Sequence, residues 1–406
     1  MLQGMAEPAP SEPSRTLTLR ARLGLRAAYL AGALVALAVG LRVDPTPLVE
    51  KGGACDDALR RRRHVADEVR RGVLPADIGT KLDQFKGEYA FGAYAMSAYA
   101  LTNIALDAPE TKAETLELLD LIVERMASPE LSRFDAALWS EEALATLSKD
   151  RGHIAYLGHL NLILGARRLL GGDGRHDALH GAITGAIARR MRTAPHRHVE
   201  TYPGETYTMD NVVAVASLAV ADRVRSEDHR ATIDEWLAYT RARLLDPTTG
   251  LIVFQLESES GAPQQRGRGS AAGWASFFLP MIDLPFAREQ WAAARTHLHG
   301  RVGPFAGVRE YHPTDPSAGF GDIDSGPVLG WGVSATGFSL AGAKRHGDAA
   351  TLGGLLSLAE AFGISTDDET PLGPSRRYVA APLLGQSILL CMSTARPWWD
   401  GMGERK

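Results

Sequence analysis

Apolar side chains recur at helical spacing along almost the whole chain after residue 56, and this pattern limits what the chain can fold into. The stripes come in pieces of roughly 12 to 20 residues, separated by Gly, Pro and Asp. Strand patterns are scarce. The predicted helices cover 58–71, 85–106, 110–126, 134–149, 153–170, 175–192, 210–224, 227–243, 285–298, 327–345, 347–362 and 382–395.

A dozen helices in alternation predict an all-α fold, and we expect an (α/α)6 toroid with one short β-hairpin. The hairpin arm is expected at 251–259, after a turn at Gly250. No low-complexity linker follows residue 50, so residues 56–400 are predicted to form a single domain. The long polar inserts lie at one side of the helix pairs and should meet at a central cavity. An α-solenoid is the second architecture, but it needs a more regular repeat.

The amino terminus reads as a tail followed by a membrane-directed segment. Residues 1–22 begin with a run rich in Pro, Ser and Glu and are predicted to be disordered. Residues 23–43 contain an uncharged apolar run after several arginines and are predicted to be a transmembrane anchor or signal segment. A buried helix of the domain is the alternative. The anchor predicts a membrane partner and a catalytic domain outside the cytoplasm, in the periplasm of a bacterium.

Bulk charge and cysteine content exclude several classes of function. The 406-residue chain has a net charge of −4 and no strongly basic region, so nucleic acid is not expected as a partner. Cys55 and Cys391 form no metal-binding motif, and they could either pair as one disulfide or remain buried thiols. Because nucleic acid is not expected, a small molecule is the expected substrate. Because the cysteines form no metal-binding motif, we predict no metal.

The stretch ETYPGETYTMDN, residues 200–211, carries an unusual density of acids and phenols just before an apolar helix. A helix cap would explain Asp210 but not Glu205, Tyr202 and Tyr207 as well. Carboxylates become acids at neutral pH only when they are desolvated or paired, as in a closed cavity. The stretch therefore predicts a polar pocket with Asp210 and Glu205 as catalytic groups and the two tyrosines on the substrate.

Other candidate residues lie in four further segments. His159 interrupts an apolar helix beside Gly158, and it is either a core residue or a general acid or base. Asp83 and Tyr89 begin an earlier helix. The segment 257–280 is either a solvated loop or a basic lid, and the segment 320–338 carries two aspartates without a third metal ligand. From these two segments the substrate-binding candidates are Arg266, Trp274, Asp324 and Trp331.

Gly158-His159-Leu160, followed some forty residues later by a loop with Pro203 and Asn211, resembles the linalool dehydratase/isomerase family. Members are (α/α)6 toroids that add or remove water at an allylic alcohol without a cofactor. The resemblance covers roughly residues 80–345 and implies that His159 is catalytic, with Asp83 and Tyr89 as further site residues. It also implies association into rings, so a homo-oligomer is a possible partner state.

The loop departs from the family at the positions of two cysteines, which are replaced by Thr201 and Asp210. The resemblance thus implies a lyase or isomerase that uses cofactor-free acid–base catalysis on an isoprenoid-like or other hydroxylated substrate. Toroids also support carbohydrate-active enzymes, such as glycosidases, epimerases and polysaccharide lyases, and the same acids and aromatics suit that alternative. A non-catalytic, membrane-tethered binding protein is the third hypothesis.

Overall fold

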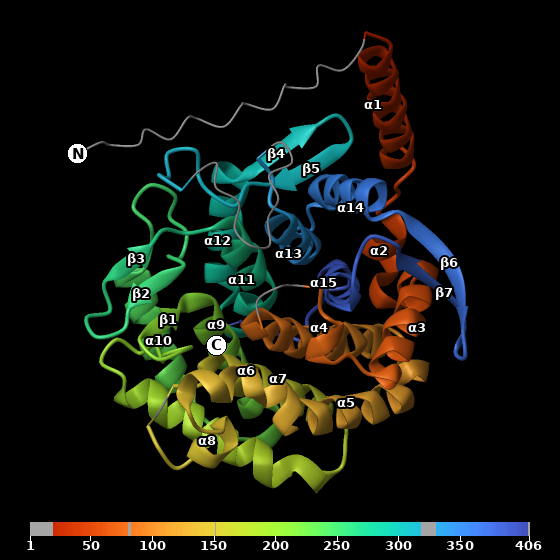
Figure 1. Cartoon of the computed structure of the whole chain (residues 1–406). Coiled ribbons are helices and arrows are strands. Elements are labelled where there is room, and N and C mark those ends of the chain that lie inside the picture. Colours follow the sequence, from red (N-terminus) through yellow and green to blue (C-terminus); the bar gives the residue numbers. More distant parts are fainter. Residues whose placement is uncertain (1–18, 80–82, 151, 318–329, 405–406) are drawn as a thin grey trace, which may run out of the picture.

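The computed structural model describes the chain except for residues 1–18, 80–82, 151, 318–329 and 405–406. Within the described residues, helices form an inner and an outer layer around a common axis (Figure 1). The inner layer consists of α4 (Asp83–Asp107), α7 (Ile154–Leu169), α9 (Thr208–Arg225), α11 (Gly269–Ile282), α13 (Val333–Arg345) and α15 (Leu383–Ser393). The outer layer consists of α3 (Asp56–Arg71), α5 (Lys112–Met126), α8 (Asp177–Thr193), α10 (Arg230–Arg243), α12 (Leu284–His297) and α14 (Ala349–Gly363).

The inner helices close into a ring. Each contacts the next along the chain, from α4 through α7, α9, α11 and α13 to α15, and α15 packs against α4. At this closure Ser97 and Ser387 share a hydrogen bond of 2.8 Å, and the Asn103 amide donates to the Cys391 carbonyl at 3.0 Å. The predicted (α/α)6 toroid is therefore confirmed.

The two ends of the ring differ because the connections differ in length. Five outer helices (α5, α8, α10, α12 and α14) each follow an inner helix after a few residues, and α3 precedes α4. The chain enters α9, α11, α13 and α15 through longer segments that carry the strands. These strands are β1 (Glu205–Tyr207), β2 (Gln255–Glu257), β3 (Pro263–Gln265), β4 (His299–Val302), β5 (Phe305–Val308), β6 (Ser365–Thr370) and β7 (Gly373–Tyr378). They pair as an antiparallel sheet β1–β2–β3 and two hairpins, β4–β5 and β6–β7. The polar inserts therefore gather where the inner helices begin.

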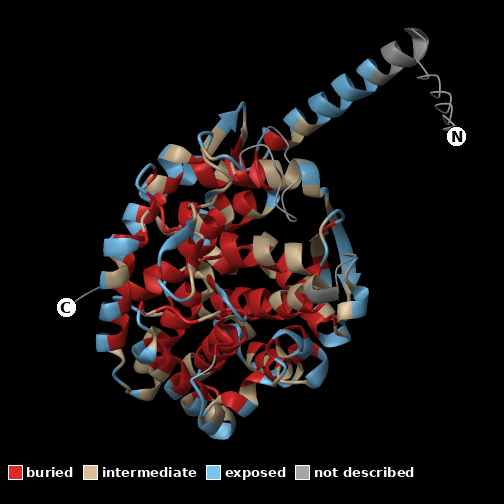
Figure 2. Ribbon diagram, turned by 60° about the vertical axis from the view of Figure 1, so that its left-hand side comes forward, coloured by how far each residue is buried: buried red, intermediate tan, exposed pale blue. Residues whose placement is uncertain are grey.

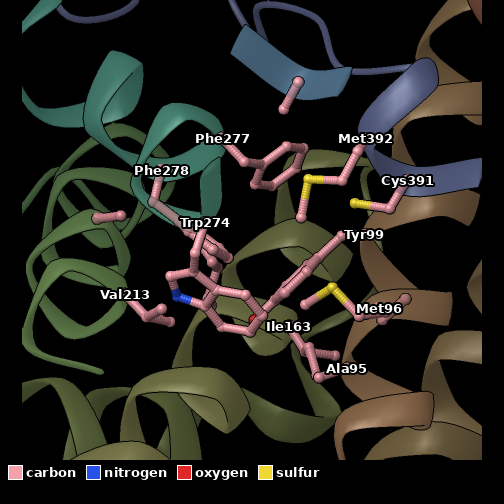
Figure 3. Packing of buried hydrophobic residues seen from close by; sticks show 14 of the residues in the cluster. Ala95, Met96, Tyr99, Ile163, Val213, Trp274, Phe277, Phe278, Cys391 and Met392 are labelled. Atoms are coloured by element: carbon pink, nitrogen blue, oxygen red, sulfur yellow. The ribbon is translucent and has the colours of Figure 1, made fainter. Parts of the chain in front are cut away.

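The axis of the ring is filled with side chains. Figure 3 shows Met96 and Tyr99 of α4 packed with Trp274 and Phe277 of α11 and with Met392 of α15. Buried residues dominate the centre of the domain in Figure 2. Inner helices contact neighbours on all sides, which explains why α11 is apolar around its whole circumference. The central cavity that the sequence predicts is, at this depth, a packed aromatic core.

One predicted helix is not part of the ring, and one ring helix was not predicted. The segment predicted as a helix over 134–149 folds as α6 (Pro129–Trp139) and a 3-10 turn, which lie in the insert before α7. Residues 269–282, which overlap the end of the segment 257–280 interpreted as a loop or lid, form α11. Ser226, which lies between the predicted helices 210–224 and 227–243, ends α9 in the left-handed conformation, with φ of 55°.

The amino-terminal helix α1 (Leu19–Gly40) projects from the domain (Figures 1 and 2). Its end docks on α14, where the Ser357 hydroxyl donates to the Gly40 carbonyl at 2.9 Å, and α2 (Thr46–Lys51) follows. Among the described helices, none has both the length and the apolarity needed to cross a bilayer. The predicted transmembrane anchor and membrane partner are therefore not supported. Cys55 and Cys391 are both buried as free thiols.

Candidate active site

The acidic stretch before α9 forms a tight turn that returns on itself. Tyr202 and Glu205 pair across the turn, and Gly204 takes a φ of 79°, which side chains disfavour. The Glu200 carboxylate accepts the Gly204 N–H at 3.0 Å and so fixes the turn. β1 then leads directly into α9, which places the phenol of Tyr207 and the carboxyl of Asp210 at the same end of the ring.

Asp210 lies in the first turn of α9 but does not cap it. The residue at the cap position is Tyr207, and no side chain caps the helix there. Instead the Asp210 carboxyl accepts a hydrogen bond of 2.8 Å from the Thr201 hydroxyl, which itself accepts the Tyr207 N–H at 3.3 Å. Burial raises the pKa of Asp210 to about 6, although the Thr201 hydroxyl opposes this rise by stabilising the ionised form. Asp210 can therefore hold a proton near neutral pH.

Tyr202 connects Asp210 to the start of α4. Its hydroxyl donates to the carboxylate of Glu88, and burial together with the charges of Glu88 and Asp210 raises the pKa of Tyr202. The phenol is thus a permanent hydrogen-bond donor. Because Tyr202 interacts with both Glu88 and Asp210, it joins α4 and the segment before α9 into one polar cluster.

A second group of side chains lies along the β-sheet beside this cluster. The Tyr207 hydroxyl donates to the exposed Glu205 carboxylate at 2.9 Å, and its ring contacts Phe254 with centroids 5.2 Å apart. The Arg268 guanidinium lies over Phe254, 4.1 Å from the ring centroid, and also faces Tyr311 at 5.2 Å. Aromatic faces and a cation therefore flank the acids, all of them partly exposed.

Sequence reasoning missed a buried acid–histidine pair beneath the cluster. His153 Nδ1 donates to Asp135 at 2.6 Å, and both side chains are fully buried. In the described structure, His153 Nε2 and Asp135 Oδ1 have no hydrogen-bond partner. His153 also holds a φ of 58° just before α7, an unusual conformation for a side chain of this size. The two residues are eighteen positions apart, so only the fold brings them together.

His159 lies inside the aromatic core. Its Nδ1 and the Tyr99 hydroxyl are joined by a hydrogen bond of 2.8 Å, and its ring lies 5.5 Å from Trp274 between centroids. Burial lowers the pKa of His159 to about 3, so the imidazole is uncharged at neutral pH. This setting matches the core-residue interpretation of His159.

The remaining candidates occupy different parts of the domain. Arg266 is bound to the Asp246 carboxylate at 2.6 Å, and Trp274 and Trp331 are buried. Trp331 covers Gly300 and Gly307 of the β4–β5 hairpin. Tyr89 is partly buried on α4, one residue beyond Glu88, and stacks on Phe85.

Two candidates lie at or beyond the limits of the described residues. Asp324 lies outside the described residues, and Asp83 opens α4 at the edge of them. Among the residues that are described, no three His, Cys, Asp or Glu side chains are arranged to hold a metal ion.

Comparison with known proteins gives no family model that matches the chain. Among solved structures, the α-1,6-mannanase GH76A of Salegentibacter sp. HEL1_6 matches with 9% identity over 82% of this chain and 97% of that chain, at a TM-score of 0.49. An inactive variant of that enzyme in complex with α-1,6-mannotriose matches with 10% identity over 75% and 88%, at 0.47. A family 76 glycoside hydrolase from a bovine Bacteroides thetaiotaomicron strain matches with 10% identity over 75% and 68%, at 0.43.

The resemblance to the linalool dehydratase/isomerase family is wrong, because the solved structures that the chain matches are glycoside hydrolases. The predicted lyase or isomerase reaction on an isoprenoid-like substrate is wrong with it. At these scores the matches identify neither the reaction nor the substrate of this chain, so both have to come from its own residues.

Proposed function

We propose that the chain is a carbohydrate-active hydrolase that cleaves a glycosidic bond, with Asp210 as the proton donor. The observation that carries the proposal is the pKa of Asp210, which burial raises to about 6, at a position where Glu88 and Glu205 belong to the same cluster of polar side chains. Glycoside hydrolysis needs one carboxyl group that holds a proton for the leaving oxygen and a second that is negatively charged.

Two carboxylates are placed to supply the negative charge. Glu88 accepts a hydrogen bond from Tyr202, and Glu205 accepts one from Tyr207. The negative charge of Asp210 contributes to the raised pKa of both Tyr202 and Tyr207. The two carboxylates that these phenols contact therefore lie close enough to the proposed acid to interact with it electrostatically.

The aromatic wall beside the acids suits a sugar. Pyranose rings present apolar C–H faces that stack on aromatic side chains, while their hydroxyl groups need charged or polar partners. Phe254 and Tyr311 offer such faces on either side of Arg268, whose guanidinium can donate to hydroxyl or carboxylate oxygens. A pocket for an isoprenoid would be lined by apolar side chains and would not place a guanidinium between the aromatic rings.

The experiment is a screen of the purified chain against oligosaccharides of different linkage, including α-1,6-mannooligosaccharides, with product detection by mass spectrometry. We expect cleavage of at least one substrate, lost by at least about a thousandfold in Asp210→Asn, because an amide cannot donate the proton. Asp56→Asn, an exposed aspartate at the start of α3, is the matched control and should retain full activity. Binding of glycans without any cleavage would instead support a non-catalytic binding protein.

The second carboxylate is identified by the same assay. Glu88→Gln and Glu205→Gln each remove one negative charge with little change of shape, and the variant with the larger loss marks the group that acts on the sugar. Alanine at that position should be partly rescued by azide, a small anion that can take the place of the carboxylate. Full activity in both glutamine variants would contradict the two-carboxylate mechanism.

A further inference from the structure

A cavity of about 550 Å³ lies at the end of the ring opposite the acidic cluster. It is formed where α11 passes into α12 and α13 into α14, and the carboxy-terminal segment from Pro397 to Glu404 closes its side. Cavities of this volume commonly hold small molecules. Nothing in the proposed hydrolysis uses this end of the molecule.

The wall of the cavity carries a guanidinium whose charge is not balanced. Arg345, at the last turn of α13, forms no hydrogen bond or ion pair with any described residue, and its Nε is buried. Burial and the nearby charge of Arg396 lower the pKa of Arg345 to about 10, which still leaves it positive at neutral pH. A partly buried charge without a partner is unfavourable, and an anion that reached it would relieve that cost.

The neighbouring imidazole provides a second polar group. His346 is stacked on Trp291, with ring centroids 6.0 Å apart and planes at 19°, and its Nε2 has no partner among the described residues. Burial and the positive charges of Arg345 and Arg288 lower the pKa of His346 to about 4. At neutral pH the ring is therefore uncharged and can donate one N–H to a ligand oxygen.

The rim of the cavity determines what can enter. Arg288 is exposed there, and so are the carboxylates of Asp400 and Glu404, while the half-buried Trp399 offers an aromatic face. The two carboxylates repel large polyanions. A small molecule that carries its negative charge at one end can pass them and reach Arg345.

We propose that this cavity binds a small organic anion, whose carboxylate or phosphate oxygens pair with Arg345 and His346 and whose flat body packs on Trp399. A guanidinium pairs two oxygens of either group with matching geometry, so both headgroups share the same recognition chemistry. The site is separate from the acids at the other end of the ring and does not depend on the reaction proposed for them.

Isothermal titration calorimetry of the full chain tests this site with phenyl phosphate, benzoate and the uncharged benzyl alcohol. We expect saturable binding of at least one of the two anions at micromolar to low millimolar concentration, and none of the alcohol. Binding of only one anion assigns its headgroup as the natural one. Since neither anion is a sugar, Asp210→Asn should bind the same anion or anions as the wild type, with unchanged affinity.

Arg345→Gln should weaken binding at least tenfold, while Arg243→Gln, which alters an exposed arginine outside the cavity, should have no effect. Thermal unfolding checks that the variants fold. Arg288→Gln serves as a second charge-removing variant and should weaken binding severalfold. Absence of saturable heat with both anions, or unchanged affinity in both cavity variants, would overturn the proposal.

Discussion

Asp210 is a carboxylic acid that is costly to ionise, and it lies in the first turn of the buried helix α9. Its pKa in the folded chain, about 6, lies above the value of 3.8 expected for a free aspartate. The folded state therefore binds the proton more tightly than the unfolded state, and this contribution to stability is full at low pH and disappears as the pH rises through 6. At neutral pH the folded protein retains a desolvated charge.

Replacing Asp210 with asparagine should therefore stabilise the protein at pH 8 and have little effect at pH 4. The shift in pKa corresponds to at most about 3 kcal/mol at about 1.36 kcal/mol per pH unit, and solvent at the partly exposed carboxyl will reduce it. Urea unfolding at the two pH values measures the difference, with Asp56→Asn as the control. A variant less stable than the wild type at pH 8 would contradict the raised pKa.

The hydroxyl group of Thr201 lowers the pKa of the Asp210 carboxyl. Its hydrogen bond favours the ionised form of Asp210, so Thr201→Val should raise the pKa of Asp210 further. The alkaline limb of the pH profile of kcat should then move to higher pH, because the acid stays protonated longer. A profile that moves to lower pH, or does not move, would show that Asp210 does not control that limb.

At the scale of single elements, the sequence predicted the six outer helices and every inner helix except α11. Outer helices such as α5 and α12 show one apolar stripe and one charged face, which is the pattern that helical periodicity detects. By contrast, α11 is apolar on every side and contains Pro280, so it shows no stripe. Its burial depends on neighbours that are distant in sequence.

Close packing between the helix layers can be tested at glycines. A side chain at Gly342 of α13 would overlap the indole ring of Trp291 on α12, whereas one at Gly185 of α8 would meet nothing within 4 Å. Gly342→Ala should destabilise the protein by more than about 2 kcal/mol through overpacking. Gly185→Ala should stabilise it by up to about 1 kcal/mol through helix propensity. Thermal denaturation compares the two, and equal effects would argue against this packing.

The start of α7 depends on the buried pair formed by Asp135 and His153. Removing the imidazole alone leaves a buried carboxyl without its partner, so His153→Ala should cost about 3 kcal/mol or more. The double variant Asp135→Ala/His153→Ala should lose less than the sum of the single changes, because the two groups interact directly. A double-mutant cycle from urea unfolding measures this coupling, and additive losses would mean that the 2.6 Å contact contributes nothing.

At the scale of the whole molecule, the ring separates two polar ends by an aromatic core. Helical periodicity and the one-sided inserts were sufficient to predict the toroid. The sequence could not show that Tyr99 and Trp274 would fill the axis and enclose His159, because these residues come from inner helices far apart in the chain. Nor could it place Glu88 against Tyr202, since that contact exists only once the ring has closed.

The most direct test of the central claim is cleavage of an oligosaccharide in ¹⁸O-labelled water by the wild type and by Asp210→Asn, followed by mass spectrometry. Hydrolysis with Asp210 as the acid predicts products that carry one ¹⁸O from the wild type and essentially none from the variant. Products without the label and with a new double bond would indicate elimination instead. Labelled products in equal amounts from both proteins would remove Asp210 from the mechanism.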